Sequence, residues 1–194
     1  HAQGDAAIEM LLNTIEKANK FFPRPEARHR IEHAGIASPD LVYRMKKLNV
    51  LPIPNPAFIY EFGDGYVKDY GERAKQMYPL GDYISSGIIA AIGSDCPVTT
   101  YEPMLGLYAA LTRKTQNGKI IGENKRIALL DAIRMYTING AYASFEDKIK
   151  GSIEPGKLAD LVLLDRSLLQ ADIEEIPEIQ VEWTMIDGNF VFVR

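Results

Sequence analysis

Three short stretches of the chain each end in a side chain that can bind a metal ion. His1 opens the chain and is followed by Ala-Gln-Gly-Asp, whereas His33 closes the stretch Arg30–His33. Asp95 follows the apolar run Ile88–Ile92. Two imidazoles and one carboxylate are ligand types that hold zinc and similar divalent cations. The pattern therefore predicts a metal-dependent hydrolase.

The position of these residues at strand ends is the reason for grouping them. The run Ile88–Ile92 is closed by Gly93 and Pro97, which is typical of a strand buried on both faces of a parallel sheet. In barrels of parallel strands the chemistry is carried out at the carboxyl ends, where loops vary without disturbing the core. Asp95 is therefore expected at a functional edge of the sheet.

The remaining elements alternate between helices and strands, which predicts an α/β fold with a parallel sheet. Helical spacing of apolar residues follows Asp5, which we interpret as the N-cap, and Ser38 with Pro39 marks a second helix start. Short strands are expected at 29–33 and 50–54, and helices at 72–78, 80–86, 104–114 and 125–136. The aromatic-rich section 55–71 is interpreted as a long loop, either a pocket wall or a small core of its own.

The pattern changes at about Lys150, after which the chain is rich in turns and β-formers. Strands are expected at Leu161–Leu164, Val181–Ile186 and Asn189–Val193. The dipeptide Asp187-Gly188 between the last two strands is a strong signal for a two-residue hairpin. This tail is expected to form a second, small sheet.

Composition excludes several classes of protein. Hydrophobic residues make up 46% of the 194 residues, with no apolar run near the eighteen or so needed to cross a membrane. The net charge of -4 gives no basic face for nucleic acid. A single cysteine, Cys96, excludes an internal disulfide and favours a reducing compartment, the cytoplasm. We expect Cys96 to pack as a small apolar side chain.

Each candidate residue also has a structural interpretation. His1 could be a disordered end or a tag remnant, His33 a buried hydrogen-bonded histidine, and Asp95 a turn or cap residue. His29 lies four residues before His33, about 13 Å away along a strand, which is too far to share a metal. We interpret His29 as a structural or a surface residue.

Five motifs in this order resemble the C-terminal half of the amidohydrolase superfamily, in its formamide-deformylase-like and exoenzyme-regulatory-protein-like branch. These motifs, which extend over almost the whole chain, are His1–Asp5, Ile31–Ala34, Gly93–Pro97, Tyr136–Ala141 and Gly151–Val162. The resemblance implies that residues 1–148 are strands five to eight of a (β/α)8 TIM-type barrel. Residues 149–194 would be part of a small β-sandwich. The chain also starts at what reads as a strand end, so further sequence is expected upstream.

The resemblance also implies roles for the candidate residues. His1, His33 and Asp95 would be metal ligands, most simply of zinc, while a His-x-His pair and a carboxylated Lys or Glu would lie upstream. Asp95 would serve as general base and then general acid, and His33 would help to polarise the carbonyl through the metal. The expected reaction is hydrolysis of the C–N bond of a small-molecule amide or N-acyl compound, with the fragment alone inactive.

Two further expectations concern partners. A non-catalytic small-molecule sensor of the same fold is the alternative to an enzyme, because the resemblance includes regulatory proteins. No nucleic-acid or membrane partner is expected. A homo-oligomer is one way to cover the exposed strand edges that a half barrel leaves.

Overall fold

A row of parallel chain segments forms the centre of the fold, in a computed structural model that describes all 194 residues. Strand β1 (Arg30–Glu32) pairs in parallel with β2 (Leu51–Ile53). Ala2 adds a parallel bridge to His33 on the other side of β1. Ile31 is fully buried whereas its two neighbours in β1 are not, so one face of the row packs on the core and the other carries charge.

The segment 88–94, expected from its sequence to be a strand, completes the row but is not a regular strand. The N–H groups of Ala91 and Gly93 donate to the carbonyl oxygens of Pro52 and Pro54, at 3.3 and 3.1 Å. Because proline has no N–H, neither residue can donate a hydrogen bond in return. The hydrogen bonds therefore run only from segment 88–94 to residues 52 and 54, and none returns from these prolines. The segment thus lacks the complete hydrogen-bond pattern of a regular strand.

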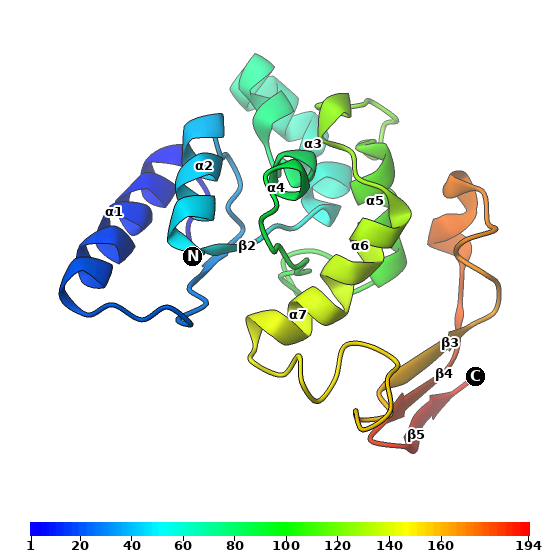
Figure 1. Cartoon of the computed structure of the whole chain (residues 1–194). Coiled ribbons are helices and arrows are strands. Elements are labelled where there is room, and N and C mark those ends of the chain that lie inside the picture. The colour runs from blue at the N-terminus through cyan, green and yellow to red at the C-terminus, as the bar shows by residue number, and fades with distance from the viewer.

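Helices flank this row on both sides, as Figure 1 shows, with α1 and α2 on one side of β2 and α3, α5 and α6 on the other. The expected alternation of strands and helices is therefore confirmed for this part of the chain. The helices are α1 (Asp5–Phe21), α2 (Pro39–Leu48), α3 (Ala57–Tyr70), α4 (Leu80–Ser85), α5 (Pro103–Thr112), α6 (Leu129–Tyr136) and α7 (Ile138–Ala143). Three 3-10 segments are η1 (Gly71–Gln76), η2 (Glu123–Lys125) and η3 (Ile173–Glu178). None of the helices combines the length and the apolar character that crossing a bilayer requires.

The starts of the first two helices show how far local signals predict structure. Helix α2 begins as expected, because the Ser38 hydroxyl accepts a bond from Leu41 N–H and Pro39 occupies the first helical position. The expected N-cap of α1 is wrong by one residue. Gly4 is the N-cap, and Asp5 is already helical, with its carboxylate accepting a bond from Ala6 N–H.

The expectation that section 55–71 is a long loop is wrong, because most of it forms helix α3. Phe58, Phe62, Tyr66 and Tyr70 recur at intervals of four, which places them on one helical face. Their successive ring centroids are 5.2, 6.4 and 6.3 Å apart. The aromatic residues therefore form a ladder along a helix.

The main core lies between the helices and the buried face of the parallel row. It combines the apolar stripes of α1 and α2 with residues from β1, α4, α5 and α6. Its fully buried members include Ile8, Leu12, Ile31, Met45, Leu80 and Tyr83. This packing fixes the strand ends relative to one another.

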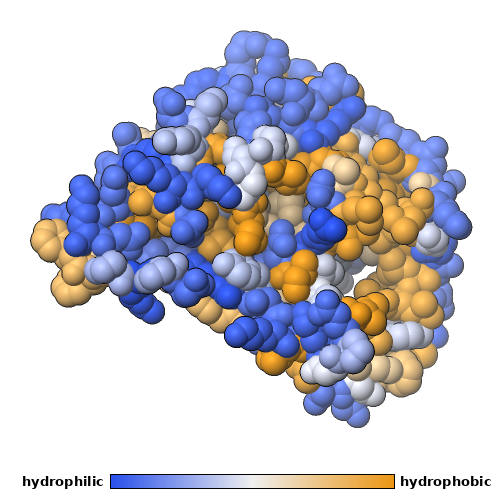
Figure 2. Space-filling view, viewed as in Figure 1, coloured by the Kyte–Doolittle hydropathy of each residue, from blue (hydrophilic) through white to orange (hydrophobic).

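The C-terminal tail forms the small antiparallel sheet that was expected. Strands β3 (Leu161–Leu164), β4 (Val181–Ile186) and β5 (Asn189–Val193) pair in that order. Asp187 and Gly188 both have positive φ, 48° and 77°, as a type I′ hairpin requires. The sheet lies to one side of the helices (Figure 1), and Figure 2 shows a hollow between the two. A cavity of about 440 Å³ is lined by α7 and by residues 150–153 and 160–162.

Candidate metal centre

A pocket of about 280 Å³ lies where the parallel segments end. Its lining contains no hydrophobic residue and consists of His1, Glu32, His33, Asn55, Gly93 and Asp95. Each of the four segments of the row contributes to it, since His1 adjoins Ala2 and Asn55 follows β2. The three residues singled out from the sequence, His1, His33 and Asp95, therefore line one polar pocket.

The two imidazoles are adjacent. The ring centroids of His1 and His33 lie 4.6 Å apart with an interplanar angle of 76°. His33 is 7% exposed, whereas His1 is exposed. His33 has a φ of 71° and Ala34 a φ of 44°, so the chain leaves β1 through left-handed backbone that non-glycine residues seldom adopt. Such strain recurs at functional sites.

Asp95 stands on a turn that other side chains hold in place. The Ser94 hydroxyl accepts a bond from Cys96 N–H at 3.2 Å, and the Thr99 hydroxyl donates to the Ser94 carbonyl at 2.6 Å. The Asp95 carboxylate accepts no hydrogen bond from the chain and is exposed in the pocket. Its side chain is therefore not used as a turn or cap group. Cys96 is exposed, so the expectation that it packs in the interior is wrong.

Asn55 is a site residue that the sequence reasoning missed. It is 3% exposed, and its amide bridges two groups of the pocket. The Asn55 Oδ1 atom lies 2.8 Å from His33 Nδ1, and Asn55 Nδ2 donates to the Gly93 carbonyl at 2.7 Å. The sequence contained the relevant signal, a polar side chain after an expected strand, because Asn55 follows a strand as His33 does.

Glu32 also lines the pocket and was not anticipated. Its Oε1 accepts bonds from Arg30 Nε and Nη2, at 2.8 and 2.7 Å, within β1. A carboxylate beside two imidazoles adds negative charge on the wall of the pocket.

The pocket does not contain a complete set of metal ligands in binding geometry. No group of three or more His, Cys, Asp or Glu side chains in the structure is close enough to hold a metal ion. The two imidazoles are adjacent, and the carboxylate lines the same pocket from another segment. The donors present are those that zinc prefers, so their chemistry fits a divalent cation.

Other residues considered from the sequence have structural surroundings. His29 is not part of the pocket lining. Asp5 pairs with Arg73 at 2.7 Å on the surface, where both side chains are more than half exposed.

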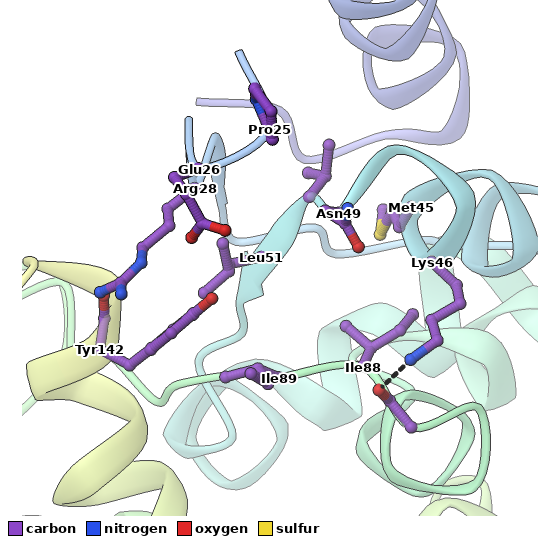
Figure 3. A pocket seen from close by; sticks show the side chains of 12 residues that line it. Pro25, Glu26, Arg28, Met45, Lys46, Asn49, Leu51, Ile88, Ile89 and Tyr142 are labelled. Carbon is purple, nitrogen blue, oxygen red and sulfur yellow. Dashed lines mark hydrogen bonds between the residues drawn. The ribbon is translucent and has the colours of Figure 1, made fainter. Parts of the chain in front are cut away.

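Another cavity, of about 260 Å³, lies at the opposite ends of the same segments (Figure 3). Arg28 lines it, with its guanidinium carbon 3.7 Å from the ring centroid of Tyr142 and a 2.6 Å ion pair to Asp147. Apolar residues such as Leu51 and Ile88 complete the wall. None of the candidate metal ligands reaches this cavity.

Comparison with solved structures shows that the fold of this chain is similar to that of metal-dependent hydrolases. The structure superimposes on a metal-dependent hydrolase from Pyrococcus horikoshii OT3 with a TM-score of 0.75 and 29% identity. The match covers 90% of this chain and 35% of that one.

The family model described as the amidohydrolase family matches residues 1–192, and the chain belongs to this family. Its sequence is 32% identical to an N-substituted formamide deformylase from Arthrobacter pascens and 30% identical to the putative amidohydrolase YtcJ of Bacillus subtilis. Both matches cover 100% of this chain, but only 36% and 37% of the relatives. The expected resemblance to the formamide-deformylase-like branch is thus confirmed, and the chain spans about a third of the length of these relatives.

Proposed function

We propose that this chain forms part of a metal-dependent hydrolase that cleaves the C–N bond of a small-molecule amide or N-acyl compound. The observation that supports this proposal is the convergence of His1, His33 and Asp95 on one polar pocket at the ends of parallel segments. Family membership and the fold of a metal-dependent hydrolase support the same class of reaction.

The proposal includes the architecture expected from the sequence. Residues 1–148 would be strands five to eight of a (β/α)8 barrel, and residues 149–194 part of a β-sandwich. The row of parallel segments and the separate antiparallel sheet support this division. Further ligands would come from strands that are not part of this chain. We also propose a cytoplasmic location, which the single cysteine supports.

The residues have distinct roles in the proposed mechanism. His1 and His33 would hold the cation through neutral imidazole nitrogens, and Asp95 would approach it from the neighbouring segment. The chemistry that zinc supplies when bound is activation of water at neutral pH, because it lowers the pKa of that water to about 7.

The proton is handled by Asp95. Its carboxylate is free of hydrogen bonds within the chain, so an oxygen of Asp95 can accept the proton of the attacking water. The same oxygen can then deliver that proton to the nitrogen of the leaving amine, as general acid–base catalysis requires. One carboxylate thus serves both proton transfers.

Titration calorimetry with Zn²⁺ on the metal-free chain tests the metal site. We expect binding that His33→Gln abolishes and Asp95→Asn weakens at least tenfold. The matched control is His29→Gln, which removes a histidine outside the pocket and should leave binding unchanged. Equal effects of the substitutions at His33 and His29 would contradict the site.

Amine release from N-formyl and N-acyl amines, measured on a zinc-loaded protein that also contains the proposed upstream strands, tests the reaction. Since removing a general acid–base typically costs 10²–10⁴-fold, Asp95→Asn should lower any turnover by that factor. Turnover that survives this substitution would rule out the assigned role of Asp95.

A further inference from the structure

Asn55 has two hydrogen-bond partners that fix its orientation. The Gly93 carbonyl oxygen can only accept a hydrogen bond, so the atom of Asn55 that lies 2.7 Å from it must be the amide nitrogen. The amide oxygen of Asn55 therefore faces His33 Nδ1 at 2.8 Å. The assignment follows from the chemistry of the partner rather than from the shape of the amide, which is nearly symmetric.

This orientation determines which nitrogen of His33 carries the proton. An amide oxygen can only accept a hydrogen bond, so His33 Nδ1 must donate. In a neutral imidazole the other nitrogen, Nε2, then carries a free lone pair. A lone pair on an unprotonated nitrogen is what a metal cation requires.

The hydrogen bond between Asn55 and His33 is buried. Asn55 is 3% exposed and His33 is 7% exposed, so water competes little for either group. Loss of the bond would leave a buried donor unpaired, which is unfavourable because water cannot replace the lost partner. The alternative tautomer would place a lone pair of Nδ1 against the lone pairs of Asn55 Oδ1.

The hydrogen bond from Asn55 to the Gly93 carbonyl connects Asn55 to the segment that carries Asp95. A Cβ atom at position 93 would lie 3.3 Å from Asn55 Nδ2, closer than most side-chain contacts, so glycine there lets the amide reach the carbonyl. One side chain thus joins the end of β1, the end of β2 and the segment before Asp95.

We propose that Asn55 is a positioning residue that holds His33 as the Nδ1-protonated tautomer and directs the Nε2 lone pair into the pocket. The role of this tautomer in metal binding rests on the proposed function. The tautomer itself follows from the hydrogen bond to Asn55 and does not depend on a metal. Partners of this kind around metal-ligating histidines typically contribute 10–100-fold to metal affinity.

Long-range ¹H–¹⁵N spectra of the imidazoles in the metal-free chain at neutral pH test the tautomer. The chain has three histidines, so single His→Gln variants assign every signal. We expect the native chain to show Nδ1 of His33 protonated and Nε2 unprotonated. In Asn55→Leu the other tautomer should become the major one.

Two further variants separate positioning from loss of structure. Asn139→Leu is the matched control, because Asn139 Nδ2 also donates to a carbonyl of the same segment, that of Ala90 at 2.8 Å, without touching a histidine. It should lower stability and leave the His33 tautomer unchanged. Asn55→Asp keeps an acceptor for Nδ1 but places an oxygen against the Gly93 carbonyl, so it should retain the tautomer while lowering stability.

Calorimetry with Zn²⁺ then connects the tautomer to the pocket. Asn55→Leu should weaken zinc binding 10–100-fold, and Asn55→Asp should restore most of it. A native tautomer in Asn55→Leu, or unchanged zinc affinity in a variant whose tautomer has shifted, would overturn the inference. If the native chain binds no zinc while the tautomer still depends on Asn55, the proposed function fails and the positioning of His33 stands.

Discussion

Arg113 provides the sharpest test of how the helices around the pocket are held together. It is fully buried where α5 ends and forms no ion pair within 4 Å, although the Asp82 carboxylate acts on it electrostatically. Its guanidinium donates to the carbonyl oxygens of Ile121, Tyr78 and Met77, at 2.8, 2.7 and 2.7 Å. Burial lowers the pKa of Arg113 to about 10, and the three carbonyls compensate for the lost water.

Replacing Arg113 by methionine removes these donors and keeps a flexible chain of similar length. The Ile121 and Met77 carbonyls would be left without a donor, whereas the Tyr78 carbonyl keeps a hydrogen bond from Leu80 N–H. Each buried carbonyl without a donor costs roughly 1–3 kcal/mol, and removal of the buried charge returns part of this sum. We expect Arg113→Met to lower the free energy of unfolding by about 3 kcal/mol. The left-handed backbone at position 113 is equally unfavourable for both residues, so that strain cancels.

Urea unfolding followed by circular dichroism at 222 nm measures the effect. With a slope of about 2 kcal/mol/M, the midpoint should fall by about 1–2 M at an unchanged slope. Arg113→Lys should recover only part of the loss, because an ammonium cannot reach three carbonyls in fork geometry. The control Arg166→Met, at an exposed site, should stay within about 0.5 kcal/mol of the native chain. A midpoint for Arg113→Met equal to that of this control would refute the reasoning.

Two further predictions concern acid stability and glycine positions. The hydrogen bond from Arg28 lowers the pKa of Asp147 below its usual value of about 4, so the stabilisation is complete above that pH and is lost as pH falls through the native pKa. Asp147→Asn should therefore flatten the fall of the urea midpoint between about pH 5 and about pH 2, and an unchanged profile would contradict the pairing. Gly122 and Gly118 both have positive φ, 62° and 78°, but only at Gly122 would a Cβ collide with a backbone atom, the Lys75 carbonyl oxygen. Gly118→Ala should cost about 1 kcal/mol and Gly122→Ala at least about 2 kcal/mol in thermal or urea unfolding, and equal losses would show that the collision is relieved.

Features set by adjacent residues could be predicted from the sequence. The hairpin at Asp187-Gly188 depends on two residues that tolerate positive φ, and the start of α2 depends on Ser38 and Pro39. The grouping of the candidate site also followed from a simple rule, the position of a polar side chain after an apolar strand. The same rule applied to Asn55 would have added it to the site.

Features set by packing could not be predicted in this way. The section 55–71 was expected to be a loop, but its Gly63 lies within α3, where a Cβ would be 2.6 Å from Thr115 Cγ2. The glycine therefore serves close packing of the helix rather than a turn. Exposure of Cys96 likewise depends on the turn built by Ser94 and Thr99, which the sequence of the run before it does not reveal.

The one-sided pairing of segment 88–94 has a consequence for what holds Asp95 at the pocket. Pro52 and Pro54 accept hydrogen bonds from this segment but have no N–H group with which to donate any. Other groups supply further bonds, because Asn55 and Asn139 donate to the Gly93 and Ala90 carbonyls and Ile92 N–H donates to the Met135 carbonyl. Asp95 is therefore kept beside the imidazoles by side chains and a neighbouring helix as well as by the parallel row.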